Sequence, residues 1–375
     1  MSVATRGAVP APPRALTKPL DALLRVVSER FPLLGSATPL DAAQEHARLV
    51  ARWSVADEAT PRWTAPALDR AQLATARRDL ERARAVLATT AEPWLLLYRD
   101  RIDELCAELE VIDAAFGPTV TELARRRFPV EATLGARADA LADRWLAEPD
   151  DAGGDERIVT DDPRDPRSLL SQMRRAIAAA GVGVRIVVRP RVGALAAAGD
   201  GVVIVAEGAR TTEADARRVV LHELEGHVLP RERGRAAEVG LCALGGAGAS
   251  EDEEGRALLL EERAGLLSPP RRRTLAARHH ACRLVDAGAG FVEVVRALRP
   301  RIELEPALAV AARTMRGGFS RDGDVRGGVM RERVYLPAFL RIGAAVDGDP
   351  GLLATLGTAR LSLGAHAILA SSRAR

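Results

Sequence analysis

The sequence predicts an α+β fold that is mainly helical, with a small sheet and a helical N-terminal region. Apolar residues recur at three- and four-residue steps over residues 19–150, as they do on one face of an α-helix. Two later stretches, 182–190 and 200–208, have the apolar, alternating pattern of half-buried strands. The remainder, 270–375, is expected to be helical again around a Gly-rich loop at 315–329. The chain of 375 residues, 47% hydrophobic and 28% charged, is long enough to bury a sizeable core.

The N-terminal half divides into a tail, a helical region and a linker. Residues 1–18 are rich in Pro and Ala, which predicts a disordered tail. Residues 19–150 contain several strongly periodic segments and are expected to form a helical subdomain. The stretch 147–168 is acidic and rich in Gly and Pro, which indicates a loop or linker. It separates the helical subdomain from a core over residues 168–375.

The core is expected to begin with a helix, two strands and a second helix. The first helix should end at Gly181, ahead of the two strands. Thr212 is a suitable N-cap for the second helix, with Asp215 three residues further on. Ser250 and Glu253 have the spacing of a capping box, which predicts that a further helix begins near Ser250.

Composition excludes several classes of protein. Aromatic residues make up only 3% of the chain and the net charge is +3, with basic residues spread throughout, so a dedicated nucleic-acid binder is not expected. No run of 18 uncharged apolar residues predicts a membrane span. The N-terminus lacks a signal-peptide core and the three cysteines are far apart, so the cytoplasm is the expected compartment. The sequence gives no indication of oligomeric state.

The peptide VVLHELEGHVL contains His222, Glu223 and His227. A histidine followed by glutamate, with a second histidine four residues after the first, is the signature of many zinc peptidases. Here the histidines stand five residues apart, which separates them by about 140° around a regular α-helix. Both can face one metal only if the helix carries a π-type bulge or ends between them. Gly226 and Pro230 favour a helix that ends there.

A catalytic zinc site takes three protein ligands and keeps a fourth position open, so the two histidines need a partner. The acidic segment that follows them offers candidates, among them Glu254. Its neighbours Glu251, Asp252 and Glu253 are expected to be solvated at a helix N-terminus, where the helix dipole favours acidic groups. A helix, strands, a histidine-bearing helix and a carboxylate-bearing helix together form the layout of a zincin-like metallopeptidase core.

Two segments, HELEGH and DEEGRA, resemble the H-E-x-x-x-H and E-E-G-L-A elements of the microtubule-associated tyrosine carboxypeptidases. Their bacterial relatives, the QEGLA-motif proteins, share both elements. The segments GAGFVEVVRAL and RGG…GGVMRERVYL are similar to further elements in the same order, and ATPLDAAQEH and TPRWT echo positions upstream. The resemblance implies that His222, His227 and Glu254 bind Zn²⁺ and that Glu223 is the catalytic base.

The sequence also departs from the family pattern. Glu225 stands where the family has glycine within H-E-x-x-x-H, and Gly226 follows it. Arg256 replaces the leucine of E-E-G-L-A, while Arg331 and Glu332 replace a Lys-Asp pair and keep its charges. These changes leave the three residues that the resemblance assigns as zinc ligands unchanged, but they are expected to alter the shape and specificity of the pocket.

Three further side chains are candidates for substrate binding and catalysis. Tyr335 could donate a hydrogen bond to the oxyanion, with core packing as its alternative role. A carboxypeptidase must bind the free α-carboxylate of its substrate, and the planar fork of arginine suits a carboxylate. Arg316 and Arg331 flank the Gly-rich loop at family-like positions. The strand at 200–208 could pair as a sheet edge with the substrate backbone.

The predicted function is therefore that of a zinc-dependent metallocarboxypeptidase, which releases C-terminal residues, aromatic ones among them, from a peptide or protein tail. Glu223 would take a proton from a zinc-activated water and pass it to the leaving amine. Two alternatives are a zinc-binding regulatory protein without turnover and a zinc endopeptidase or amidase. Glu223 argues against a purely structural site, which usually has four protein ligands and needs no base.

Overall fold

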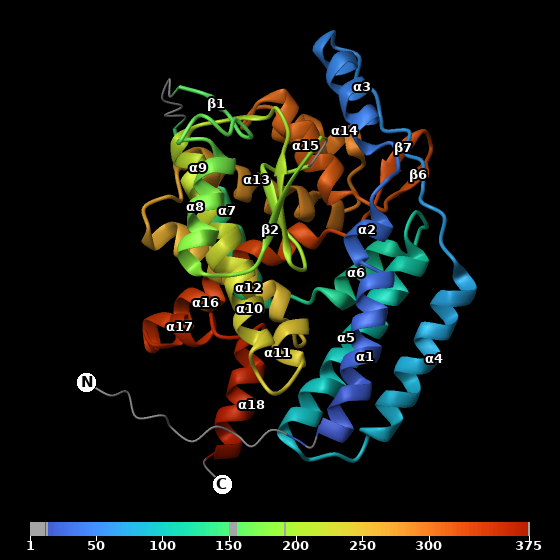
Figure 1. Cartoon of the computed structure of the whole chain (residues 1–375). Helices are drawn as coiled ribbons and strands as arrows, with labels where there is room; N and C mark the ends of the chain where they lie inside the picture. The colour runs from blue at the N-terminus through green and yellow to red at the C-terminus, as the bar shows by residue number, and fades with distance from the viewer. Residues whose placement is uncertain (1–11, 13, 150–155, 191–192, 374–375) are drawn as a thin grey trace.

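The computed structural model describes residue 12 and residues 14–149, 156–190 and 193–373. Within these ranges the chain is mainly helical and holds three small sheets, in agreement with the predicted α+β class. Long N-terminal helices stand beside a larger body that contains the sheet and the C-terminal helices (Figure 1). No helix in the described ranges is both long and apolar enough to cross a membrane.

Helices account for the N-terminal region, as predicted. They are α1 (Arg14–Arg30), α2 (Leu33–Ala37), α3 (Ala42–Ser54), α4 (Arg70–Val86), α5 (Pro93–Ala114), α6 (Val120–Arg127) and α7 (Ala132–Leu146). Because α1 begins at Arg14, residues 14–18 are helical, and the prediction of a disordered tail is wrong for these five residues. Leu24 and Val27 explain this helix, since they bury one of its faces. Residues 1–11 and 13 lie outside the described part.

The middle of the chain contains most of the strands. Its elements are β1 (Ile158–Val159), α8 (Leu169–Ala180), β2 (Arg185–Arg189), β3 (Ala196–Ala198), β4 (Val202–Ala206), β5 (Arg210–Thr211) and α9 (Glu213–Leu221). The described residues of the predicted linker are largely irregular, but they include β1, which pairs antiparallel with β5. Two predicted helix boundaries are confirmed: Gly181, at φ 66°, follows α8, and the Thr212 hydroxyl caps α9 by accepting from the Asp215 N–H.

The main sheet has the strand order β2-β4-β3, with β2 parallel and β3 antiparallel to β4. The two strands expected from the sequence correspond to β2 and β4. Strand β3 was not predicted, because three alanines show no alternation of polar and apolar residues. Since β4 lies between the other two strands, the prediction that it forms a substrate-pairing edge is wrong, and β3 is an edge instead.

The rest of the chain is helical around one hairpin. Its elements are η1 (His222–Val228), α10 (Leu229–Arg235), α11 (Leu241–Leu244), α12 (Ala249–Arg263), α13 (Pro269–Asp286), α14 (Phe291–Leu298), α15 (Leu304–Thr314), β6 (Phe319–Arg321), β7 (Asp324–Arg326), η2 (Arg331–Val334), α16 (Tyr335–Gly348), α17 (Leu352–Thr355) and α18 (Leu363–Arg373). The capping box predicted at Ser250 is wrong, because α12 starts one residue earlier, after Gly248 at φ 69°. The Gly-rich loop contains the antiparallel pair β6–β7.

Buried apolar side chains form three clusters. The largest joins α3 and α7 to α12–α16, and the rings of Trp145 and Phe339 meet in it with centroids 5.9 Å apart. A second cluster lies among α1, α4, α5, α11 and α18, and a third packs α8 and α9 on the main sheet. The N-terminal helices thus contribute to two cores that also contain C-terminal residues. The division into a helical subdomain and a core stays a prediction.

A buried ion network also joins the N-terminal helices to α12. Arg127 of α6 places its guanidinium nitrogens 2.9 Å from Glu104, 2.8 Å from Glu108 and 2.7 Å from Glu251. Arg101 supplies a second positive charge to Glu104 and Glu108 of its own helix, α5. Because the Arg127 side chain is only 5% exposed, solvent screens these interactions little. Arg127 therefore fixes the start of α12 against the N-terminal helices.

We predict that Arg127→Met lowers the free energy of unfolding by about 3–5 kcal/mol, because it leaves buried Glu251 without its ion-pair partner and takes one of two cations from Glu104 and Glu108. Urea titration followed by circular dichroism measures this change. Arg126→Met is the matched control, since Arg126 is 64% exposed and pairs only with the exposed Glu122. It should change the free energy by less than about 0.5 kcal/mol. Equal effects of the two substitutions would contradict the role given to Arg127.

Candidate metal centre

The five-residue spacing of the two histidines is accommodated by a π-helical segment. Residues His222–Val228 form η1, in which backbone hydrogen bonds join residues five apart and so bring such residues onto one face. The predicted π-type distortion is therefore present. The alternative, a helix that ends between the histidines, is wrong, because the chain continues directly from η1 into α10. His227 Nε2 lies 3.4 Å from His222 Nε2.

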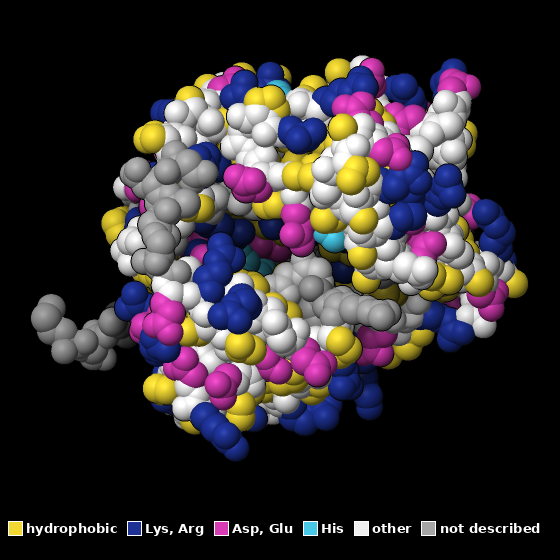
Figure 2. All heavy atoms as spheres, turned by 90° about the horizontal axis from the view of Figure 1, so that it is seen from above, with side chains coloured by type: hydrophobic (Ala, Val, Ile, Leu, Met, Phe, Trp, Pro, Cys, Tyr) yellow, Lys and Arg dark blue, Asp and Glu magenta, His cyan; other side chains and the backbone are white. Residues whose placement is uncertain are grey.

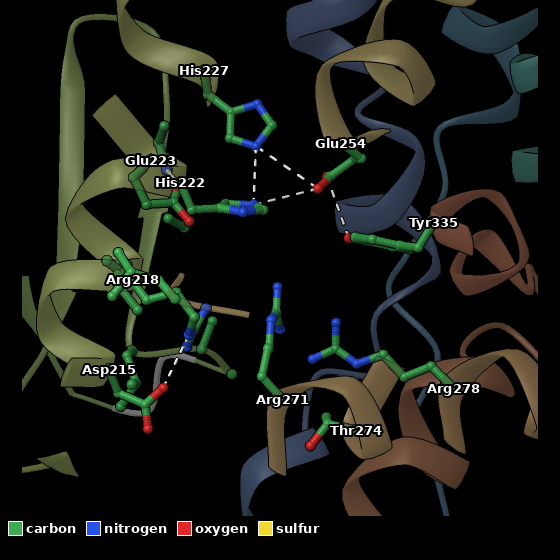
Figure 3. Close-up of a pocket in the computed structure, with 18 of the residues that line it drawn as sticks. Asp215, Arg218, His222, Glu223, His227, Glu254, Arg271, Thr274, Arg278 and Tyr335 are labelled. Atoms are coloured by element: carbon green, nitrogen blue, oxygen red, sulfur yellow. Dashed lines mark hydrogen bonds and ion pairs between the residues drawn. The ribbon is translucent and has the colours of Figure 1, made fainter. Parts of the chain in front are cut away.

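A carboxylate of α12 completes a triangle of donor atoms. Glu254 Oε2 lies 3.5 Å from His222 Nε2 and 3.8 Å from His227 Nε2 (Figure 3). Zinc–ligand bonds of the usual length in a tetrahedral site separate neighbouring ligand atoms by about 3.3–3.6 Å. These three residues are also the group in the described part of the chain that could hold a metal ion. The donor set and its spacing fit zinc.

Each histidine has a carboxylate on the side away from this triangle. His222 Nδ1 lies 2.7 Å from Oε1 of Glu261, a residue with no exposed surface. Burial alone would raise the pKa of Glu261, but the nearby Arg271, His222 and Arg218 outweigh it and lower the pKa to about 2. An ionised Glu261 accepts the Nδ1 proton, which leaves the Nε2 lone pair of His222 directed at the triangle.

The other two members of the triangle are oriented in a similar way. His227 Nδ1 lies 3.6 Å from Glu253 Oε2, and Arg360 holds that carboxylate with both oxygens bound, at 2.6 and 3.0 Å. The second oxygen of Glu254, Oε1, accepts hydrogen bonds from the Tyr335 hydroxyl and from Arg331, both at 3.3 Å. Glu254 is thereby left with Oε2 free to face the two imidazoles.

The acidic start of α12 is buried, so the prediction that Glu251, Asp252 and Glu253 are solvated is wrong. Their exposed fractions are 9%, 4% and 8%. Every acidic residue of the run has its own arginine: Glu251 pairs with Arg127, Asp252 with Arg341, Glu253 with Arg360 and Glu254 with Arg331. The arginines neutralise the carboxylates inside the protein, where the helix dipole alone would not suffice.

Two glycines allow α12 to approach its neighbours closely enough to place Glu254. A Cβ on Gly226 would lie 2.7 Å from the Cβ of Ala257, where η1 meets α12. A Cβ on Gly255 would lie 2.6 Å from the backbone carbonyl of Ala338, where α12 meets α16. Real Cβ atoms do not approach so closely, so a side chain at either glycine would force the helices apart.

Glu223 lies beside the triangle and is fixed by the sheet. Its Oε2 accepts a hydrogen bond of 2.8 Å from the backbone N–H of Ala198 in β3. None of the described residues donates a hydrogen bond to Oε1, the other oxygen of Glu223. One oxygen thus orients the carboxylate and the other can take part in proton transfer.

A cavity of about 860 Å³ adjoins the triangle and contains Glu223, Arg331 and Tyr335 among its lining residues. The hollow is visible from above, with histidine, arginine and acidic side chains inside it (Figure 2). Arg316 does not line the cavity and is half-buried. Burial lowers the pKa of its guanidinium, and the positive charge of the neighbouring Arg313 lowers it further. The structure therefore brings six of the seven predicted site residues together and leaves Arg316 outside.

Several lining residues were not identified from the sequence. They include Arg218 of α9, Arg313 of α15, and Arg271, Thr274 and Arg278 of α13. The three residues of α13 are spaced i, i+3 and i+7, so they share one helical face. That spacing was a visible signal, but only the fold shows that this face points to the cavity.

Two imidazoles and one carboxylate that converge on one another, with a second carboxylate beside them, define a candidate metal-dependent hydrolase centre. The sequence profile described as microtubule-associated tyrosine carboxypeptidase matches residues 57–370. The chain therefore belongs to that family, as its resemblance implied. No curated protein matches the chain.

We predict that Gly255→Ala lowers the free energy of unfolding by about 1–3 kcal/mol and weakens metal binding, because it separates α12 from α16. Thermal unfolding and metal titration measure the two effects. The control is Gly343→Ala in α16, where a Cβ would meet no atom within 4 Å. Removing a helical glycine there should be neutral or stabilising by up to about 1 kcal/mol. A Gly255→Ala protein as stable as wild type would show that the close contact is dispensable.

Glu261→Gln should reduce zinc affinity by about 10- to 100-fold, because the neutral amide orients and polarises His222 less than the carboxylate does. Competition with a chromophoric chelator measures the affinity. Glu262→Gln changes the next residue, which is exposed, and should leave the affinity unaltered. Unchanged zinc affinity in a folded Glu261→Gln protein would remove Glu261 from the centre.

Proposed function

We propose that this protein is a zinc-dependent metallocarboxypeptidase that removes single residues from the C-terminus of a peptide or protein. The observation that carries the proposal is the triangle of donor atoms, with separations of 3.4, 3.5 and 3.8 Å, next to Glu223 in a member of a carboxypeptidase family. His222, His227 and Glu254 would hold the ion. Helix, sheet, histidine-bearing helix and carboxylate-bearing helix follow one another as in zincins.

Glu223 is the proposed general base. A zinc ion held by His222, His227 and Glu254 would supply an acidified water and a Lewis acid for the scissile carbonyl. Glu223 receives the proton of the attacking water on Oε1, while Ala198 N–H keeps the carboxylate oriented through Oε2. The same carboxylate, now protonated, can act as the acid that delivers this proton to the leaving amine.

Tyr335 and Arg331 are proposed to stabilise the oxyanion and to bind polar groups of the substrate. The Tyr335 hydroxyl and the Arg331 guanidinium are 3.2 Å apart, and both contact Glu254. Donors held in place before the reaction stabilise developing negative charge without reorganisation. Arg316 lies outside the cavity and would act on substrate only through these neighbours.

Strand β3 is the proposed partner of the substrate backbone. It is an edge of the main sheet, its residues line the cavity, and its Ala198 contacts Glu223. An extended peptide can add to such an edge through main-chain hydrogen bonds. The scissile bond would then lie within reach of the base. The family name points to an aromatic terminal residue as the first to test.

The decisive test combines metal analysis with C-terminal cleavage of a peptide library. Wild type should bind one zinc per chain and release single C-terminal residues. Glu223→Gln should keep the zinc and lose about 100- to 10,000-fold in kcat, because general base catalysis contributes that much. His227→Ala should lose both zinc and activity.

The control is Glu225→Gln, which alters a glutamate of the same π-helical segment outside the cavity lining. It should retain zinc and activity. Zinc in wild type without any cleavage would favour a regulatory zinc-binding protein. Cleavage that persists when the C-terminus is amidated would indicate an endopeptidase or amidase, and absence of zinc binding would refute the proposal.

A further inference from the structure

The part of the cavity next to the metal triangle is lined by five arginines, which we call the arginine chamber: Arg218, Arg271, Arg278, Arg313 and Arg331. They come from α9, α13, α15 and η2, which are far apart in the sequence. Arg271 and Arg278 lie side by side on α13 and extend toward the space between His222 and Tyr335 (Figure 3). The chamber thus opens directly onto the proposed site of bond cleavage.

One wall of the arginine chamber is built around Glu261. Arg271 approaches both oxygens of this carboxylate at 3.2 Å, and Arg218 lies 3.6 Å from one of them. Arg218 also bonds Asp215 at 2.9 Å. Each guanidinium has about five N–H donors. Arg271 uses two of them on Glu261 and Arg218 uses one on Asp215, so both arginines retain donors for a ligand.

The opposite wall is built around Glu332 and Tyr335. Arg313 lies 2.6 Å and Arg278 3.6 Å from Glu332, which is 3% exposed. The guanidinium groups of Arg278 and Arg331 lie 5.8 and 5.7 Å from the centre of the Tyr335 ring. Arg278 Nε is buried without a hydrogen-bond partner among the described residues. Burial lowers the pKa of Arg278 to about 10, because it outweighs the negative charge of Glu332, which would raise this pKa.

The charges that line the cavity do not balance. The five arginines of the chamber carry five positive charges and face five carboxylates, so the surplus comes from Arg157 and Arg231, which line the same cavity. The five carboxylates are Asp215, Glu223, Glu254, Glu261 and Glu332. Elsewhere in the cavity Arg360 and Glu253 neutralise each other. A surplus of two positive charges in a partly buried space favours a ligand with two negative charges.

We propose, on the basis of the carboxypeptidase function proposed above, that the arginine chamber receives a C-terminal residue with two carboxylates, namely glutamate or aspartate. One carboxylate is the α-carboxylate and the other belongs to the side chain. The planar forks of Arg271 and Arg278 suit bidentate contacts with them. Thr274 lies between these two arginines on the same face of α13 and lines the cavity with them.

An aromatic terminal residue fits this charge distribution less well. Arginine can stack on an aromatic ring, but the ring is neutral and would leave one excess positive charge unpaired. Among the described residues that line the cavity, Tyr335 is the one Phe, Tyr or Trp, so the walls offer little aromatic surface for a substrate ring. Terminal glutamate therefore gains charge-assisted hydrogen bonds that terminal glutamine or tyrosine cannot form.

The test uses peptides that are identical except for a last residue of Glu, Gln or Tyr, with the zinc-loaded full-length protein. We expect kcat/KM for Glu to exceed that for Gln by at least about tenfold, since a site built for a charged group rejects its neutral isostere. Arg278→Met should lower this Glu-to-Gln ratio at least about fivefold. Arg283→Met, on α13 but outside the cavity and 41% exposed, should leave the ratio unchanged.

The outcomes separate this inference from the proposed function. Release of Gln or Tyr as fast as Glu by wild type would overturn the arginine chamber as a dicarboxylate site and leave the carboxypeptidase intact. If wild type releases no residue, the proposed function fails. Calorimetric binding of the Glu and Gln peptides to Glu223→Gln protein then decides on the chamber alone, where equal affinity overturns it. The wild-type comparison stands even if Arg278→Met fails to fold.

Discussion

The burial of five carboxylates on one helix is the constraint on which the rest of this structure depends. Helix α12 carries Glu251, Asp252, Glu253, Glu254 and Glu261 in positions that water reaches only slightly. An ionised carboxylate in such a position is very unfavourable unless a cation and hydrogen bonds compensate it. Arginines from α6, α9, α13, α16, η2 and the segment before α18 provide this compensation. The surrounding elements therefore have to converge on α12.

Charge compensation and backbone packing fix different parts of the candidate centre. The π-helical turn sets the directions of the two imidazoles, and Gly226 and Gly255 set how near α12 can come. The outer carboxylates and arginines then determine which atom of each ligand faces the triangle. Because the proposed ligand His222 and the chamber residue Arg271 both bind Glu261, one buried carboxylate connects the proposed metal ligands to the proposed substrate pocket.

The sequence was sufficient for features that depend on local spacing and insufficient for those that depend on distant partners. His222, His227 and the proposed base Glu223 stand within six residues, so their pattern could be recognised. Helix geometry reduced the local structure to a π-type bulge or a helix end, and the local residues favoured the wrong one of the two. The acidic start of α12 was misjudged, because an exposed helix N-terminus and a buried ion cluster look identical locally. The deciding partner of Glu251 is Arg127, 124 residues away. Strand β3 was missed for a related reason, since only pairing with β4 makes three alanines a strand.

The arginines that surround α12 come from segments on both sides of it in the chain, which has a consequence for the protein during its synthesis. Arg127 lies 124 residues before Glu251 and Arg360 lies 107 residues after Glu253, so the glutamates are held in place only after the segments on both sides of α12 have been synthesised. A nascent chain that ends before Arg331 and Arg360 would lack the cations that pair with Glu254, the proposed third ligand, and with Glu253, the partner of His227. The proposed hydrolytic activity would thus depend on the complete fold, and any unfolding large enough to separate these arginines from α12 would abolish it.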